Sequence, residues 1–305
     1  MAPVFAIIVA GYVIRRIGWL TAEADASLLR VIVNLLIPCL VLDTILGNRA
    51  LDKAGNVFLA PAVGFGTVVF GFALSYAMGP LFGARDPRQR RTFAFTTGLY
   101  NYGYLALPIA QARFGPETSG VLFIHNLGVE IALWTAGITL ISGGVKGGGW
   151  RQVLNAPVLA IVCAAALHFA GARLWMPSVM LAAVHSLGAA AIPLGLVLTG
   201  ATFADQMREL AARSNALTSF GSCVLRLGIL PLLMLALARW LPCPTELRRV
   251  IVIQAAMPSA VIPVLLAKHY GGDPTTALRI ILLTSALGLL TIPYWIQLGL
   301  RWIGG

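Results

Sequence analysis

Charged residues are scarce in this sequence. Lys, Arg, Asp and Glu account for 11% of the 305 residues and hydrophobic residues for 58%, and only 11 residues are Asp or Glu. A soluble domain carries a much larger charged fraction, usually about a quarter of its residues. The low charge, together with several apolar runs longer than about 18 residues, excludes a soluble domain and indicates a polytopic helical membrane protein.

Cysteine and the motifs of enzymes are also scarce. Of the four cysteines, Cys39, Cys163 and Cys223 lie within apolar stretches and Cys243 lies in a short loop, without a CxxC pair or clustered histidines. This pattern speaks against a disulfide framework or a metal site. The sequence also lacks GxSxG, HExxH, an acidic pair of the protease type and a nucleotide-binding loop. We therefore expect neither an enzyme nor a cofactor, and transport driven by ATP would need another chain.

The net charge of +11 comes from short basic clusters between apolar runs. Because the sequence has no long basic helix and no aromatic RNA-binding motif, we expect no nucleic acid as a partner. The first fourteen residues lack a basic segment and are followed by Arg15 and Arg16. They therefore indicate a first membrane span with its N-terminus outside, and not a cleavable signal peptide.

Charged and Pro/Gly-rich breaks divide the chain into ten expected spans, which predicts an all-α polytopic fold. The spans are 2–20, 27–48, 56–80, 92–113, 118–143, 155–173, 177–203, 215–240, 247–268 and 275–299. With the N-terminus outside, 13 basic residues fall on the cytoplasmic side and 8 on the opposite side. The positive-inside rule then places both termini on the extracytoplasmic side of a plasma membrane, the inner membrane of a bacterium.

Two pairs of segments suggest an internal repeat. Residues 35–42 match 190–197, which aligns Pro38 with Pro193, 155 positions later. Residues 112–117 match 268–273, which aligns Gly115 with Gly271, 156 positions later. Two nearly equal offsets indicate two copies of a five-span unit with opposite orientations in the membrane. The expected repeats are residues 1–143 and 155–305, joined by a short cytoplasmic loop at 144–154.

The fourth and ninth spans are poor helices. The fourth contains Asn101 and Pro108, and the ninth contains Pro258 and Pro263. Proline removes a backbone donor, and unwound backbone within the bilayer is tolerated only where it is buried in protein or lines a cavity. Both breaks are expected near the midplane, where the N-termini of half-helices form an anion site. The alternative is that these residues only allow tight helix packing.

The sequence resembles the auxin efflux carrier family of secondary transporters, which includes plant auxin carriers and bacterial permeases associated with malonate or malate. The matching stretches are 33–42, 101–115, 190–205 and 255–273, with 225–233 fitting the family's eighth span. The resemblance covers essentially the whole chain. It implies ten spans in two inverted repeats, with broken spans four and nine crossing at the site, in a fold similar to sodium/bile-acid symporters.

The family also implies a scaffold domain from spans 1, 2, 6 and 7, a transport domain from spans 3–5 and 8–10, elevator motion and a homodimer. Carried onto this sequence, the crossover is 101–108 and 257–263, and the scaffold wall is 34–38 with 191–193. The loop at 144–155 is much shorter than in many plant carriers, which argues against phospho-regulation and puts auxin in doubt as the substrate. The expected substrate-binding residues are Asn34, Asn101, Tyr102, Gly103, Asn126, Met257, Pro258 and Ser259.

Ionisable residues within spans are candidates for ion coupling because they are costly in the membrane. Glu130 and Arg226 both fall near mid-depth and are expected to pair, either as a structural ion pair or as a titrating pair. Asp43 is a third coupling candidate, with a solvated acid at a helix end as the alternative. Few oxygen ligands are available for sodium, so we expect coupling to protons or none.

These features predict a secondary active or facilitative transporter of small organic anions, such as malonate-like, malate-like or auxin-like acids, in the lipid bilayer. The alternative is an anion channel or a uniporter without ion coupling. A channel needs a polar stripe along one pore, whereas the polar residues here gather at mid-depth.

Overall fold

The computed structural model describes residues 2–103, 105–144, 153–209 and 216–304, and the regular secondary structure of these ranges is helical. Residues 145–152 of the predicted cytoplasmic loop lie outside the described residues. The first half contains α1 (Ala2–Arg16), α2 (Ala22–Val31), α3 (Ile37–Ile45), α4 (Ala60–Met78), α5 (Pro87–Gly98), α6 (Ala106–Ala132) and α7 (Ile138–Ser142). The second half contains α9 (Ala156–Phe169), α10 (Ala172–Trp175), α11 (Ser178–Glu209), α12 (Ala216–Val224), α13 (Leu230–Trp240), α14 (Thr245–Ala256), α15 (Pro263–His269) and α16 (Pro274–Ile303).

Several neighbouring helices are continuous through a π-helical turn. Such turns join α2 to α3 (Ile32–Leu36), precede α4 (Gly55–Leu59), join α6 to α7 (Leu133–Gly137) and join α12 to α13 (Leu225–Ile229). Six helical stretches are long and apolar enough to cross a membrane: Ala22–Ile45, Gly55–Phe82, Ala106–Ser142, Ser178–Asp205, Leu217–Trp240 and Pro274–Ile303. The protein is therefore a multi-pass membrane protein, as the sequence predicts.

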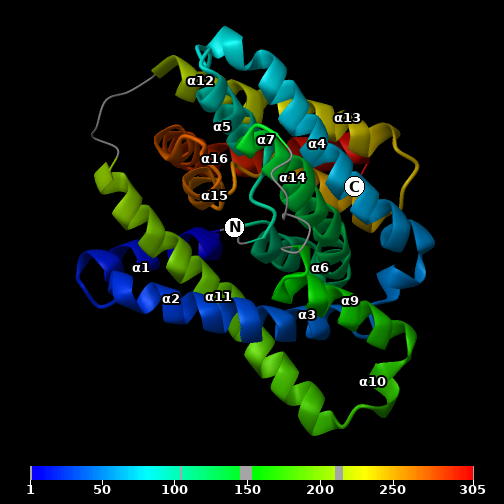
Figure 1. Cartoon of the computed structure of the whole chain (residues 1–305). Coiled ribbons are helices and arrows are strands. Elements are labelled where there is room, and N and C mark those ends of the chain that lie inside the picture. The colour runs from blue at the N-terminus through cyan, green and yellow to red at the C-terminus, as the bar shows by residue number, and fades with distance from the viewer. Residues whose placement is uncertain (1, 104, 145–152, 210–215, 305) are drawn as a thin grey trace.

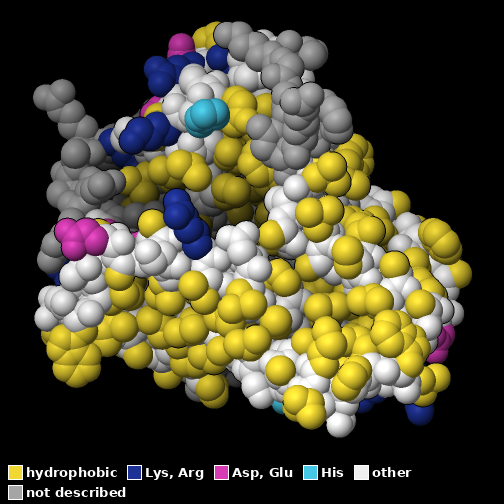
Figure 2. Space-filling model, turned by 60° about the horizontal axis from the view of Figure 1, so that its bottom comes forward, with side chains coloured by type: hydrophobic (Ala, Val, Ile, Leu, Met, Phe, Trp, Pro, Cys, Tyr) yellow, Lys and Arg dark blue, Asp and Glu magenta, His cyan; other side chains and the backbone are white. Residues whose placement is uncertain are grey.

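The helices form two packed groups, which Figure 1 shows one above the other. The lower group contains α1, α2, α3, α9 and α11, and the upper group contains α4 to α7 and α12 to α16. Figure 2 shows hydrophobic side chains covering much of the lower part of one face, while most visible Lys and Arg side chains gather at its upper left. An apolar outer surface of this kind suits contact with lipid.

Glycines set the close approaches within each group. In the lower group, a Cβ added to Gly11 would overlap the carbonyl of Val197 on α11. In the upper group, one added to Gly64 on α4 would overlap the carbonyl of His125 on α6. Small residues at such contacts bring membrane helices close enough for extensive van der Waals packing, which is the main attraction between them in lipid.

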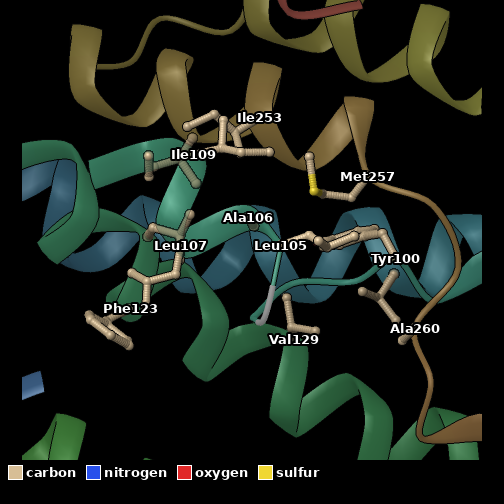
Figure 3. Close-up of a cluster of buried hydrophobic side chains, with 14 of the residues drawn as sticks. Tyr100, Leu105, Ala106, Leu107, Ile109, Phe123, Val129, Ile253, Met257 and Ala260 are labelled. Atoms are coloured by element: carbon tan, nitrogen blue, oxygen red, sulfur yellow. The ribbon is translucent and has the colours of Figure 1, made fainter. Parts of the chain in front are cut away.

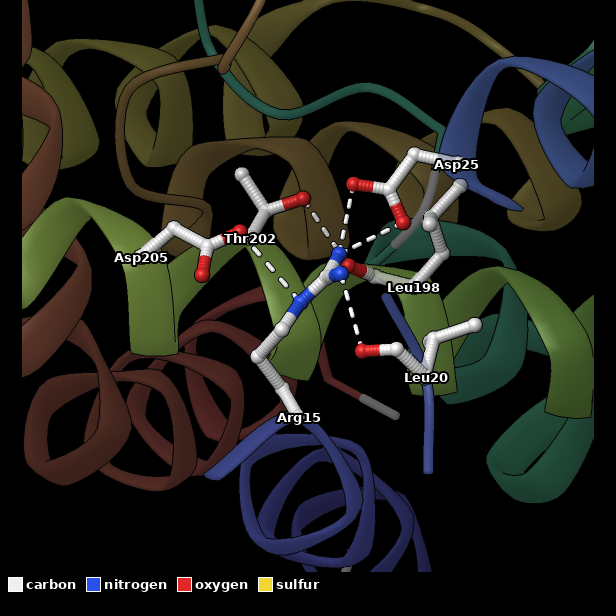
Figure 4. Close-up of polar contacts among 6 residues, drawn as sticks. All are labelled: Arg15, Leu20, Asp25, Leu198, Thr202 and Asp205. Carbon is white, nitrogen blue, oxygen red and sulfur yellow. Dashed lines mark hydrogen bonds and ion pairs between the residues drawn. The ribbon is translucent and has the colours of Figure 1, made fainter. Parts of the chain in front are cut away.

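Arg15 fixes one end of the lower group. As Figure 4 shows, its guanidinium lies between Asp25 on α2 and Asp205 on α11. It also donates a hydrogen bond of 2.9 Å to the carbonyl of Leu20. One side chain thereby joins the end of α1, the start of α2 and the end of α11.

The two glycines aligned by the predicted repeat both have a positive φ. Gly115 interrupts α6 with φ 78°, and Gly271, after α15, has φ 77°. Each ends a short helix that follows a break and is followed by a long apolar helix, Pro116 to Ala132 in the first case and α16 in the second. The predicted repeat thus aligns two glycines that each precede a long apolar helix.

Gly115→Ala should destabilise the protein by roughly 1–2 kcal/mol, because a side chain is disfavoured at this positive φ. A Cβ added at Gly115 would meet no atom within 4 Å, so a steric clash would not contribute to this loss of stability. Gly228→Ala is the matched control, since it lies in a helical turn and also has open space at its Cβ position. Thermal unfolding in detergent should show a lower midpoint for Gly115→Ala alone. Equal midpoints for the two variants would contradict the assignment of backbone strain.

Candidate substrate site at the helix crossover

Two unwound segments meet at the centre of the upper group. The described residues between α5 and α6 are 99–103 and 105, and residues 257–262 separate α14 from α15. They run antiparallel and share two backbone hydrogen bonds, from Asn101 N to Pro258 O at 2.8 Å and from Ala260 N to Leu99 O at 2.9 Å. The breaks predicted in spans four and nine therefore contact each other directly.

Apolar side chains enclose this crossover. Tyr100 and Met257 are completely buried, and Figure 3 shows them close together beside the unwound segment that leads to Leu105. The ring of Tyr100 places its hydroxyl within 2.9 Å of the Thr67 hydroxyl on α4. This packing excludes lipid from backbone groups that have left the helical hydrogen-bond pattern, as unwound backbone at bilayer depth requires.

Asn126 and Gln254 satisfy part of the released backbone. Asn126 Nδ2 on α6 donates to the carbonyl of Tyr102 at 2.9 Å. Gln254 Nε2 on α14 donates to Asn126 Oδ1 at 3.0 Å. The side-chain amides of Asn126 and Gln254 thus connect α6 and α14 to the carbonyl of Tyr102 in the unwound segment.

A cavity of about 360 Å³ lies beside the crossover, between the two helix groups. Six residues predicted as site or coupling residues line it: Asn34, Tyr102, Gly103, Pro108, Asn126 and Glu130. Ala191 and Ile192 of the predicted scaffold wall line it too. Gly103 leaves backbone open at this surface, since a Cβ added there would meet no atom within 4 Å.

The other predicted binding residues form the crossover and not the cavity wall. All four of these residues, Asn101, Met257, Pro258 and Ser259, are buried. The exposed fraction is 5% for Asn101 and zero for Met257 and Ser259. Asn101 Oδ1 faces the Leu105 amide at 3.4 Å, so the side chain turns toward the start of α6. The backbone bond between Asn101 and Pro258 is one of the two hydrogen bonds that hold the two segments together.

Two prolines differ from their predicted role as helix breaks. Pro108 is the third residue of α6, and Pro263 is the first residue of α15. A proline in the first turn of a helix loses no hydrogen bond, because amides in that turn have no partner within the helix. The breaks lie just before both prolines, and only Pro258 lies within an unwound segment.

Glu130 is held in the cavity by three donors. Its Oε1 accepts from the Tyr102 hydroxyl at 2.8 Å, and its Oε2 accepts from Trp134 Nε1 at 2.8 Å and Asn155 Nδ2 at 3.0 Å. Neither Trp134 nor Asn155 was predicted from the sequence as a partner of Glu130. Trp134 could have been predicted, because it follows Glu130 by four residues and therefore lies on the same helix face.

The expected pairing of Glu130 with Arg226 is wrong for this conformation. Arg226 is 1% exposed and lies 5.4 Å from the centre of the Tyr100 ring, while its Nη2 faces Met234 Sδ at 3.8 Å. It lines a different cavity from the one that contains Glu130. Tyr100 and Tyr102 on the unwound segment each contact one of these charged groups, so the crossover lies between them.

Asp43 lies away from the crossover. It faces His185 on α11 at 3.0 Å, at the edge of another cavity of about 350 Å³. Leu40, Pro108 and Ile192 line both this cavity and the one beside the crossover. The two cavities are therefore adjacent, with these three residues at their common border.

Among the described residues, the crossover cavity is lined by Glu130 but by no Lys, Arg or His. The start of α6 lies beside the cavity, and its amides already have partners: the Leu107 amide donates to the Gly103 carbonyl at 3.0 Å and the Leu105 amide faces Asn101 Oδ1 at 3.4 Å. Most of the remaining lining is apolar, and polar groups are supplied by Asn34, Asn126, Asn155 and Tyr102. The arrangement suits a small molecule with one polar end.

Comparisons with known proteins agree with a transporter. A family model described as Membrane transport protein matches residues 1–147 and 145–296. An uncharacterized transporter of Methanothermobacter thermautotrophicus is 25% identical over 294 residues, which cover 96% of this chain and 95% of the relative. An uncharacterized transporter of Methanocaldococcus jannaschii is 23% identical over 301 residues, with the same coverage of 96% and 95%.

Asn126→Ala should destabilise the protein by about 1–3 kcal/mol, because it removes the buried 2.9 Å bond to the Tyr102 carbonyl and the acceptor of the 3.0 Å bond from Gln254, leaving only the 3.4 Å bond from Gln254 to Tyr102. Asn34→Ala is the matched control. Asn34 is exposed and donates only to the carbonyl of Arg30, one turn earlier, so a change below about 0.5 kcal/mol is expected. Thermal unfolding in detergent compares the two, and an equal loss in both variants would remove the structural role assigned to Asn126.

Proposed function

Because the chain belongs to the auxin efflux carrier family of membrane transport proteins, we propose that it is a secondary transporter of small organic anions. Its substrates are carboxylates such as malonate-like, malate-like or auxin-like acids. The observation that carries this proposal is the crossover, where two unwound segments are hydrogen bonded to each other beside a cavity of about 360 Å³. Substrate sites of secondary transporters are typically built at such breaks.

Two inverted repeats of five spans account for the arrangement of helices. In this proposal α1, α2 with α3, α9 and α11 are spans 1, 2, 6 and 7 and form a scaffold domain. Helices α4 to α7 and α12 to α16 form a transport domain, in which α5 with the start of α6 is span 4 and α14 with α15 is span 9. The division is supported by the two packed groups and by the aligned glycines Gly115 and Gly271, which both have a positive φ.

The cavity is well placed for elevator motion. Asn34, Ile37 and Ala191 belong to the lower group of helices, whereas Tyr102, Pro108 and Glu130 belong to the upper group. Sliding one group along the other would carry the crossover past Leu40 and Ile192 of the lower group, which line both cavities. Two cavities on either side of these residues favour alternating access over a continuous anion channel.

The negative charge of an ionised Glu130 opposes the entry of an anion into the cavity. Two like charges about 5 Å apart repel by about 3 kcal/mol at an effective dielectric constant of about 20, which is roughly a 100-fold loss of affinity. The cavity lining offers no cationic side chain to offset this repulsion. We therefore propose that Glu130 takes up a proton before the anion binds, so that one proton and one carboxylate cross together.

A second candidate is transport of a small amine. An ionised Glu130 without a cationic neighbour in the cavity lining would attract a cation directly. A facilitative uniporter without ion coupling is the third arrangement, in which Glu130 serves only to position Tyr102, Trp134 and Asn155. Uptake into proteoliposomes separates these cases, using radiolabelled monocarboxylates, dicarboxylates and primary amines under imposed proton or sodium gradients.

Glu130→Gln should abolish the dependence of carboxylate uptake on an inward proton gradient, because the amide cannot take up the proton. Uptake by the parent protein should rise as the external pH falls and should not require sodium. Glu117→Gln is the matched control, since it is the same substitution at an exposed position between the Gly115 turn and the rest of α6. Preference for amines, or a parent pH profile retained by Glu130→Gln, would overturn proton coupling at this residue.

We also propose a location in the cell membrane as a homodimer, with both termini on the extracytoplasmic side. In a background lacking the four native cysteines, single cysteines at Arg88 and Arg208 should be labelled only from the cytoplasm. One at Lys53 should be labelled only from outside. The reason is the excess of basic residues in the loops assigned to the cytoplasm. Labelling of the Arg88 and Arg208 positions from opposite sides would exclude the inverted arrangement.

A further inference from the structure

Arg226 lines a second large cavity, outside the crossover site. This groove has a volume of about 590 Å³ and lies between α4 and α13. Its lining is apolar except for Arg226 and Thr67, and it includes Val63, Gly66 and Leu230. Neither the organic-anion site nor its coupling residue Glu130 contributes to this lining.

The charge of Arg226 is poorly compensated by the protein. The side chain is 1% exposed, its Nε has no hydrogen-bond partner, and no ion pair to it is found among the described residues. Its contacts are the Tyr100 ring and the sulfur of Met234, and neither carries a formal charge. The carbonyl end of α5 near Tyr100 adds only a partial negative charge, about half of one unit. A buried cation of this kind is stabilised by an anion in the same groove.

The groove opens to the hydrocarbon of the membrane. Phe70, Leu233 and Trp240 on its lining are 50%, 41% and 75% exposed on helices that cross the bilayer. Trp240 marks one end of the groove, where an interfacial aromatic is expected. Arg226 lies 14 residues before Trp240, which corresponds to about 21 Å along a helix. It therefore lies about 21 Å from the interface at Trp240 and about 9 Å from the opposite interface of a hydrocarbon core about 30 Å thick.

The depth of Arg226 in the membrane and the apolar lining of the groove together limit which ligand can bind there. The groove extends from Arg226 toward Trp240, and the phosphate of a phospholipid at that end stays at the headgroup level, about 21 Å from Arg226. A dicarboxylate dissolved in water has no polar route along an apolar groove. A single-chain carboxylic acid can dissolve in the bilayer as the neutral acid and ionise beside Arg226, where a guanidinium can bind both carboxylate oxygens.

We propose that the groove between α4 and α13 binds a fatty acid, with its carboxylate on Arg226 and its hydrocarbon chain along Val63, Leu230 and Leu233. The site is independent of the organic-anion site proposed above, because the crossover segment separates Arg226 from Glu130. It is also built from helices of the upper group alone, so that it stays intact when the two groups move relative to each other.

Two substitutions test the groove and its charge separately. Gly66→Leu should fill part of the groove, because Gly66 lines it and a Cβ at this position meets no atom within 4 Å. Gly228→Leu is the matched control, with equally open space but outside the groove lining. Arg226→Gln removes the charge, and thermal unfolding establishes that each variant is folded.

The measurement is equilibrium binding of radiolabelled dodecanoate to the delipidated, purified protein in nanodiscs. We expect one saturable site per chain, an affinity at least tenfold lower in Gly66→Leu and Arg226→Gln, and no change in Gly228→Leu or Glu130→Gln. Dodecanol should compete at least tenfold less well than dodecanoate, and malonate should not compete. Unchanged binding in Gly66→Leu would overturn the location, and equal competition by dodecanol would overturn the role of Arg226. Competition by malonate, or loss of binding in Glu130→Gln, would assign the dodecanoate to the crossover cavity instead.

Discussion

Backbone groups that leave a helix inside a membrane must find partners within the protein, and the centre of this structure depends on that constraint. The amide of Asn101 and the carbonyl of Leu99 pair with the opposite unwound segment, and the carbonyl of Tyr102 pairs with Asn126. Without these partners each exposed group would cost several kcal/mol in hydrocarbon. The surrounding helices can therefore be interrupted here, beside the cavity.

The constraint explains which features the sequence could predict. Long apolar runs predict helices because lipid permits no other open structure, and Asn101 with Pro258 marks the breaks because both residues tolerate unwound backbone. The repeat was visible because Gly115 and Gly271 occupy a conformation that favours glycine. Each of these signals acts on the local backbone, where sequence and structure are most directly related.

The parts that sequence analysis missed depend on side-chain direction. Asn101 was expected to face the substrate, yet its side chain turns toward Leu105 while its backbone makes the important bond. Glu130 and Arg226 were expected to pair because both fall at mid-depth. Depth along a helix does not specify the face, and the crossover segment lies between them, with Tyr100 against Arg226 and Tyr102 against Glu130. Two opposite charges at equal depth thus belong to two separate cavities.

The partners of Glu130 also connect the proposed proton step to the proposed movement. Tyr102 and Trp134 belong to the upper group of helices, whereas Asn155 caps the start of α9 in the lower group through its bond with the amide of Val158. Relative motion of the groups therefore leaves two hydrogen bonds of Glu130 intact and breaks the third, the 3.0 Å bond from Asn155. That bond is stronger when the carboxylate is ionised, because a charged acceptor roughly doubles the strength of a hydrogen bond. On the proposed mechanism, protonation of Glu130 both admits the anion and weakens the contact that holds the two groups together, so the loaded carrier moves more readily than the empty ionised one.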